Sequence, residues 1–190
     1  LFPFVGGVNQ KKYRVNGKEY AMNQHGFARD MEFELVSQSG QEIWFELQSN
    51  EETLQKYPYA FVLKLGYKLN GNSVEVCWQG ENPSDETMHF AIGGHPAFNC
   101  PLKEGTRQTD YVLKFDEQKQ VVSTQLSKEG MATDTKVIYD LKDGILPITE
   151  HLFDDDALVI EHHQAQMAAL CYADGTPYLT IRMAAPLFGI

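Results

Sequence analysis

Short segments of alternating apolar and polar residues, separated by residues typical of tight turns, run through most of this 190-residue chain. Asn16-Gly17, for example, lies between Tyr13–Val15 and Lys18–Tyr20. An Asn-Gly pair between alternating segments is the strongest short-range signal of a β-hairpin. Such turn signals recur every ~8–12 residues and no βαβ alternation occurs, so the pattern predicts an all-β antiparallel sandwich or barrel.

The alternation predicts strands over eleven ranges: Tyr13–Val15, Lys18–Tyr20, Glu32–Ser37, Glu42–Gln48, Phe61–Leu69, Ser73–Gln79, Met88–Ile92, Tyr111–Phe115, Ala157–Ile160, Met167–Tyr172 and Tyr178–Met183. Asn50–Tyr57 is the one helical candidate, and a helix of that length is marginal by itself. Residues 116–150 are more polar, which predicts loops and short strands there. We expect residues 1–190 to form a single domain.

Composition excludes several classes of partner. The net charge of −10 argues against nucleic acid and anionic membranes, because both select basic surfaces.

The three cysteines, Cys77, Cys100 and Cys171, are odd in number and far apart, so they indicate neither a disulfide framework nor a zinc site. Unpaired cysteines favour the cytoplasm as the location of the protein. No apolar run has membrane-spanning length. Oligomeric state stays open, a homodimer included.

A first candidate functional residue is His95, in the sequence Ile-Gly-Gly-His-Pro-Ala-Phe-Asn-Cys. Gly93 and Gly94 allow a tight bend after the alternating segment, and Pro96 restricts the backbone at His95. A titratable imidazole on a stiff corner at the end of a strand suits a proton donor. The alternative is a histidine with a structural role only.

His25 lies in a comparable setting, Asn-Gln-His-Gly-Phe-Ala-Arg-Asp. Two imidazoles brought together can serve as a general acid and a hydrogen-bonding partner. Arg29 is either a binding cation for a hydroxyl, carboxylate or phosphate, or half of a surface ion pair with Asp30 or Glu32.

Other polar residues give weaker signals. His162 and His163 would point to opposite faces of a strand and are expected at the surface. The run 154–156 of three aspartates is a solvated turn, a cap or a calcium ligand set. No dinucleotide-binding, Walker, nucleophile-elbow or zincin motif occurs.

Five motifs together resemble the aldose 1-epimerase (galactose mutarotase) superfamily, and most closely its LacX-like branch. They are Leu-Phe-Pro-Phe-Val-Gly (1–6), Asn-Gly-Lys-Glu-Tyr (16–20), Gln-His-Gly-Phe-Ala-Arg-Asp (24–30), Ile-Gly-Gly-His-Pro-Ala-Phe-Asn-Cys-Pro-Leu (92–102) and Phe-Asp-Asp-Asp-Ala-Leu (153–158). The resemblance implies an antiparallel β-supersandwich with an open sugar cleft. It also implies interconversion of the α and β anomers of a hexose without metal or nucleotide cofactor.

The same resemblance assigns roles. His95 matches the general acid that protonates the ring oxygen, and His25 matches a hydrogen-bonding partner near that oxygen. Gln24 and Arg29 match substrate contacts of hexose-phosphate epimerase relatives, and Asp156, with Asp155 as the alternative, would accept a sugar hydroxyl. Phe27, Phe98 or Trp78 would stack on the sugar or belong to the core.

Two departures from the family pattern affect activity. The family's glutamate base lies beyond the point that matches Ile190, and Gly7 stands where relatives often have arginine. Both chain ends are apolar, from which we expect an internal piece that lacks both ends of the domain and is inactive by itself. The alternatives to a mutarotase are a sugar-binding or sugar-sensing protein without turnover and a hexose-6-phosphate 1-epimerase.

Overall fold

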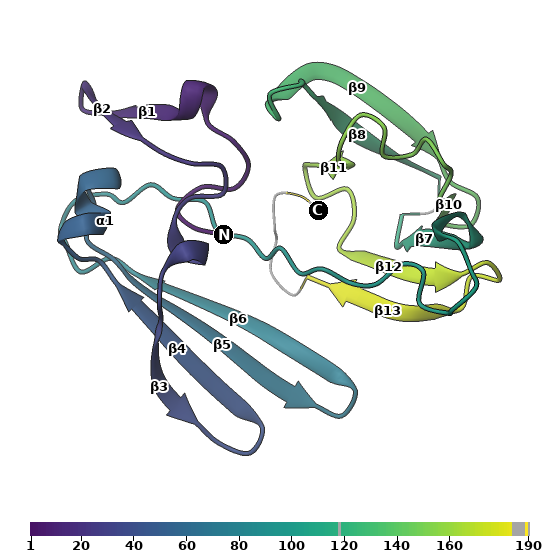
Figure 1. Ribbon diagram of the computed structural model, residues 1–190, viewed down its shortest axis with the longest axis horizontal. Helices are drawn as coiled ribbons and strands as arrows, with labels where there is room; N and C mark the ends of the chain where they lie inside the picture. The colour runs from purple at the N-terminus through teal and green to yellow at the C-terminus, as the bar shows by residue number, and fades with distance from the viewer. Residues whose placement is uncertain (118, 184–188, 190) are drawn as a thin grey trace. The chain divides into compact units, whose positions relative to one another are not determined.

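The computed structural model describes residues 1–117, 119–183 and 189, and its regular secondary structure consists mainly of β-strands (Figure 1). Within this described part the strand ladders are antiparallel and α1 (Glu51–Lys56) is the single α-helix, so the all-β prediction is confirmed. No described helix has the length and apolar character needed to cross a bilayer. The chain divides into two compact units, Leu1–His95 and Pro96–Ile190. That 1–190 form one domain stays a prediction.

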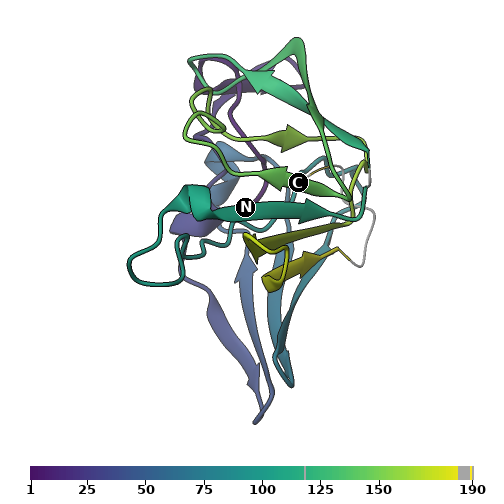
Figure 2. The same cartoon turned by 90° about the vertical axis from the view of Figure 1, so that its right-hand side faces the viewer.

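The first unit contains a four-stranded sheet of order β3-β4-β5-β6 and a separate hairpin, β1–β2. The β3–β4 and β5–β6 hairpins extend in the same direction in both views (Figure 1, Figure 2). The Asn16-Gly17 turn forms the predicted hairpin, β1–β2, and residues 70–73 close a second hairpin between β5 and β6. The strands are β1 (Lys12–Val15), β2 (Lys18–Ala21), β3 (Glu34–Gln38), β4 (Glu42–Gln48), β5 (Val62–Asn70) and β6 (Ser73–Glu81), with 3₁₀ turns η1 (Asn9–Lys11) and η2 (Ala28–Asp30).

The core of this unit forms on one face of the sheet. Leu47 and Leu63 pair across β4 and β5 and pack with the rings of Phe2, Tyr57 and Phe61. All five side chains are buried. The first residues of the chain therefore take part in the same core as the central strands.

The predicted helix is confirmed as α1, and its start is held by a capping box. The side chain of Asn50 accepts a hydrogen bond from the Thr53 backbone N–H at 2.9 Å, and the Thr53 hydroxyl oxygen accepts the Asn50 N–H at 2.8 Å. Such reciprocal bonds satisfy backbone donors that a short helix otherwise leaves open.

The predicted strand over Met88–Ile92 is wrong. The segment is extended but belongs to no ladder, and it runs beside the first residues of the chain, where the Ala91 N–H donates to the Pro3 carbonyl at 2.9 Å. Pro3 has no N–H to donate in return, so continuous pairing cannot form. Met88 and Ile92 still pack against the core, as their alternation predicts.

The second unit contains two sheets, with strand orders β10-β7-β12-β13 and β11-β8-β9. The strands predicted over Met167–Tyr172 and Tyr178–Met183 are confirmed as β12 and β13, which pair as an antiparallel hairpin. The elements are η3 (Gln108–Asp110), β7 (Tyr111–Phe115), β8 (Gln120–Leu126), β9 (Ala132–Asp140), β10 (Ile145–Pro147), β11 (Val159–Ile160), β12 (Met167–Tyr172) and β13 (Pro177–Arg182). Of the apolar chain end 186–190, only Gly189 lies among the described residues.

Two predictions in this unit need correction. Residues 116–150 contain the β8–β9 hairpin, with strands of seven and nine residues rather than loops and short strands. Polar residues are compatible with these strands because Ser123 and Thr124 are buried with hydrogen-bond partners for their hydroxyls. The strand predicted at Ala157–Ile160 shortens to Val159–Ile160.

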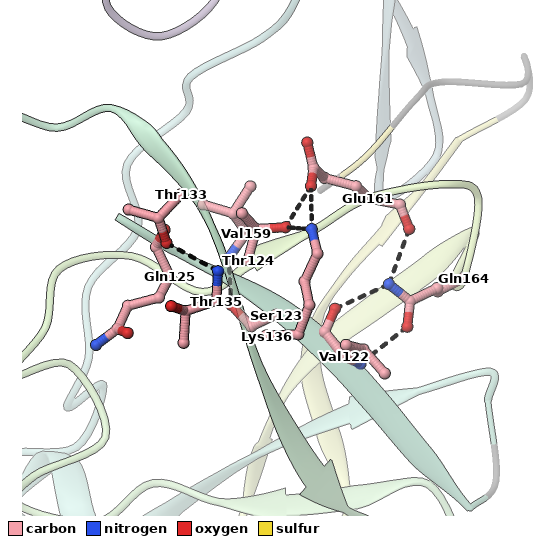
Figure 3. A network of polar contacts seen from close by, with 10 residues as sticks. All are labelled: Val122, Ser123, Thr124, Gln125, Thr133, Thr135, Lys136, Val159, Glu161 and Gln164. Carbon is pink, nitrogen blue, oxygen red and sulfur yellow. Dashed lines mark hydrogen bonds and ion pairs between the residues drawn. The ribbon is translucent and has the colours of Figure 1, made fainter. Parts of the chain in front are cut away.

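A polar network fastens the segment after β11 to the β8–β9 hairpin (Figure 3). The Thr124 hydroxyl donates to Glu161 Oε2, and Lys136 Nζ lies 3.3 Å from the same oxygen. The Gln164 side chain donates to the Val122 carbonyl and accepts from the Val122 N–H, both at 2.8 Å. The Thr124 hydrogen bond and the Lys136 charge lower the pKa of the Glu161 carboxyl.

We predict that Glu161→Gln destabilises the protein at pH 7 and that the difference disappears in acid. Because the folded-state pKa of Glu161 is lowered, its contribution is complete above the unfolded pKa and is lost as pH falls through the folded value. Urea unfolding of the parent and the variant between pH 7 and pH 3 (about the range over which carboxylates protonate) measures this. Glu104→Gln, at an exposed carboxylate, is the control. An effect of Glu161→Gln that is the same at every pH would contradict the prediction.

Candidate functional site

A cavity of about 600 Å³ lies in the first unit, and four polar side chains line it: Gln24, His25, Arg29 and His95. These are four of the five residues that the sequence predicts for the site. The volume falls in the range usual for small-molecule sites, roughly 300–1,000 Å³. The cavity is therefore large enough for a monosaccharide.

The two imidazoles meet, as the sequence predicts. The ring centroids of His25 and His95 are 5.3 Å apart and the ring planes make an angle of 74°, an edge-to-face contact. His25 is half-buried and His95 is exposed. The two residues are seventy positions apart in sequence, and both line the same cavity.

The segment Leu1–Gly6 holds the two histidine loops together, a role that the sequence analysis missed. The Phe2 carbonyl accepts hydrogen bonds from the N–H groups of Phe27 and Ala28, both at 3.1 Å. The Leu1 carbonyl accepts from the Gly93 N–H at 3.2 Å, and the Leu1 nitrogen donates to the Gly93 carbonyl at 2.7 Å. Successive residues thus bond to the His25 loop on one side and the His95 loop on the other.

Gly26 makes this close approach possible. A Cβ atom at Gly26 would lie 2.1 Å from the Phe2 carbonyl oxygen, and the residue has a φ of +75°. Only glycine combines that backbone conformation with the absence of a side chain. The glycine directly after His25 is therefore a requirement of the packing between the loop and the Phe2 backbone.

The orientation of the His25 ring is set by the backbone of Gly6. The Gly6 N–H donates to His25 Nδ1 at 3.1 Å, and the His25 N–H donates to the Gly6 carbonyl at 2.8 Å. Burial lowers the pKa of His25, and the neighbouring His95 and Arg29 lower it further. Burial and these neighbours therefore favour the neutral form of the His25 imidazole.

Arg29 lines the cavity and also lies beside Asp30, with Nε 3.8 Å from Asp30 Oδ2. Both side chains are more than half exposed. An ion pair of that length and exposure contributes at most about 1 kcal/mol. The guanidinium can therefore turn to an anionic or hydroxyl group in the cavity at small cost.

Apolar side chains complete the wall. Leu63 and Leu65 come from β5, Trp78 from β6 and Ile92 from the His95 loop. Of the three aromatic residues considered for stacking on a sugar, Trp78 lines the cavity, whereas Phe27 is buried in the core. Alternation on β5 and β6 places Leu65 opposite Trp78 on one face of the sheet.

The remaining predicted residues belong to the second unit. Asp156 lies after the turn that follows His151, and its carboxylate accepts the Ala157 N–H at 2.7 Å. Asp155 accepts a hydrogen bond from Gln125 at 3.3 Å. The sugar-contacting role of Asp156 stays a prediction. His162 and His163 are exposed, as expected, but lie in a turn rather than a strand.

Comparison with known proteins gives a consistent result. The sequence profile of the aldose 1-epimerase family matches residues 5–180. The chain is 33% identical to protein LacX (chromosomal) of Lactococcus lactis subsp. lactis over 184 residues, which covers 90% of this chain and 60% of the relative. The chain thus spans about 60% of the length of the curated relatives it matches.

Solved structures give the same picture. A galactose mutarotase related enzyme from Lactobacillus acidophilus superposes with a TM-score of 0.83 at 33% identity, over 92% of this chain and 58% of that one. A galactose mutarotase-like protein from Lactobacillus casei gives a TM-score of 0.77 at 28% identity, over 98% and 68%. The predicted fold, a β-sandwich of the galactose mutarotase type, is therefore confirmed.

We predict that Gly26→Ala destabilises the protein by more than about 2 kcal/mol, because the added Cβ overlaps the Phe2 backbone in addition to its unfavourable φ. The control is Gly17→Ala, where φ is +80° but nothing lies within 4 Å. Gly17→Ala should lose only the stability that a left-handed backbone costs a residue with a Cβ atom, about 1 kcal/mol. Urea denaturation measures both, and equal losses would contradict the close-packing argument.

Proposed function

This chain belongs to the aldose 1-epimerase family, and from that premise we propose that it interconverts the α and β anomers of a hexose. The observation that carries the proposal is the pair of imidazoles, His25 and His95, within one cavity of monosaccharide size. The reaction needs a proton donor to the ring oxygen and an acceptor for the proton of the anomeric hydroxyl. No redox step or group transfer is involved.

In the proposed mechanism His95 acts as the general acid. It is exposed to the cavity, and an imidazole exchanges protons near neutral pH. It would protonate the ring oxygen while a base takes the proton of the anomeric hydroxyl, which opens the ring to the aldehyde. Rotation about C1–C2 and the reverse proton transfers close the ring to either anomer and restore both groups.

The other lining residues would hold the sugar. Gln24 and His25 present hydrogen-bond donors, and Trp78 offers an aromatic face for the C–H groups of a pyranose. Among the described residues the cavity lining contains no carboxylate. The base is thus expected from the glutamate that the family resemblance places beyond the residue matching Ile190. A protein without that base would bind sugar without turnover.

A phosphorylated hexose is the second candidate substrate. Arg29 lines the cavity, its ion pair with Asp30 is long, and the described lining lacks any acid that would repel a phosphate. Planar guanidinium donors match phosphate oxygens well. The proposed location is the cytoplasm, where hexose phosphates occur, and the free thiols of Cys77, Cys100 and Cys171 fit a reducing compartment.

We predict that His95→Asn lowers the rate of anomer exchange by about 10²–10⁴, the usual contribution of a positioned general acid. The assay is NMR exchange spectroscopy on α- and β-glucose or galactose with the protein that contains the family's base. His163→Asn, at an exposed histidine in the second unit, should keep the parent rate. A folded His95→Asn protein with the parent rate would refute the assignment.

We predict that Arg29→Ala removes any preference for hexose 6-phosphate over hexose, because its guanidinium is a permanent cation among the described lining residues. The measurement is the ratio of kcat/KM for the two substrates. Arg14→Ala removes an exposed arginine on β1 and should leave the ratio unchanged. A preference that survives Arg29→Ala would place phosphate recognition elsewhere.

A further inference from the structure

The backbone of Gly6 offers one hydrogen-bond donor to the His25 ring. Its N–H points at Nδ1 over 3.1 Å, which requires Nδ1 to carry a lone pair. A neutral imidazole has one N–H and one acceptor nitrogen. With Nδ1 accepting, the proton of His25 is on Nε2. An imidazolium would instead bring two N–H groups, from Gly6 and from Nδ1, against each other.

Backbone contacts fix this arrangement from both ends. The His25 N–H donates to the Gly6 carbonyl at 2.8 Å, so the two residues exchange a pair of bonds. Both have left-handed backbones, with φ of +80° at Gly6 and +68° at His25. A non-glycine residue in that region costs backbone free energy, which the surrounding contacts must offset. The Phe2 backbone, packed against Gly26, keeps the loop in place.

We propose that the Gly6 amide is a positioning group that holds His25 as a neutral donor through Nε2, so that His25 contacts an acceptor oxygen of the sugar and exchanges no proton. This inference rests on the proposed function for the identity of the ligand. It divides the two imidazoles by role, because a ring whose Nδ1 is engaged has no free acceptor nitrogen for a hydroxyl proton. Proton transfer then belongs to His95.

The groups around His25 also favour its neutral form. Partial burial is the main cause that lowers the pKa of His25, and His95 and the Arg29 guanidinium lower it further. A donor that never takes up a proton keeps the same hydrogen-bonding pattern through every step of ring opening and closure. The sugar therefore keeps the same orientation in the forward and the reverse reaction.

The tautomer is measurable in the unaltered, sugar-free protein. Two-bond ¹H–¹⁵N correlation spectra of ¹⁵N-histidine-labelled protein at pH 7 distinguish a protonated ring nitrogen from an unprotonated one. We expect unprotonated Nδ1 and protonated Nε2 for His25, whose signals are identified by their loss in His25→Asn and by cross-relaxation with the His95 ring. A protonated Nδ1, or a mixture of the two tautomers, would overturn the proposal.

Two substitutions separate positioning from catalysis. Asparagine tolerates positive φ, and its amide oxygen can replace Nδ1 as the acceptor for Gly6, but its shorter side chain has no group at the position of Nε2. We expect His25→Asn to bind glucose about tenfold more weakly, while the exchange rate at saturating sugar falls far less than in His95→Asn. His25→Gln, whose amide reaches the position of Nε2, should recover part of the affinity.

The opposite kinetic result would refute the proposal: a saturating rate in His25→Asn as low as in His95→Asn, with unchanged affinity, would make His25 a proton carrier. The spectra need no turnover, so they remain decisive even if the parent protein does not exchange anomers. Absence of exchange in the parent would count against the proposed function, whereas the wrong tautomer would count against the role of Gly6.

Discussion

Backbone hydrogen bonds from the first six residues are the constraint on which the site depends. The segment Leu1–Gly6 lies between two loops that are far apart in sequence, and its carbonyls alternate between them. Phe2 anchors the segment, because its ring is buried against Phe61 and the other core aromatics. Burial of such a side chain contributes roughly 1.5–3 kcal/mol, and that stability is transmitted to both histidine loops. The packing of the core, rather than the loops themselves, thus determines the shape of the cavity.

This arrangement gives two chemically identical rings different environments. The Nδ1 atom of His25 accepts a backbone hydrogen bond, and the ring is half-buried, which lowers its pKa. The ring of His95 is exposed and contacts the first at 5.3 Å. Binding and proton transfer require opposite properties, a constant donor and a group that changes protonation. Under the proposed mechanism, differences in burial and backbone contacts would fit His25 for the first task and His95 for the second.

Turn chemistry made the hairpin at Asn16-Gly17 predictable, because only a few residue types adopt the required left-handed backbone. The β8–β9 hairpin was not predictable, since buried Ser123 and Thr124 look like loop residues until their hydrogen-bond partners are known. The motifs around His25 and His95 pointed to the cavity. The contact of Gly6 with His25 could not be predicted, because it is made by the backbone N–H, which residue identity does not reveal.

The central claim is that both imidazoles face one sugar site. The most direct test is a titration of the ¹⁵N-histidine-labelled protein with glucose, followed through the ring signals of His25 and His95. One site requires both sets of signals to move along a single binding curve with a common Kd, while those of the exposed His89 and His163 stay in place. If only one ring responds, or the two respond with different Kd values, the rings do not share a ligand and the account is contradicted.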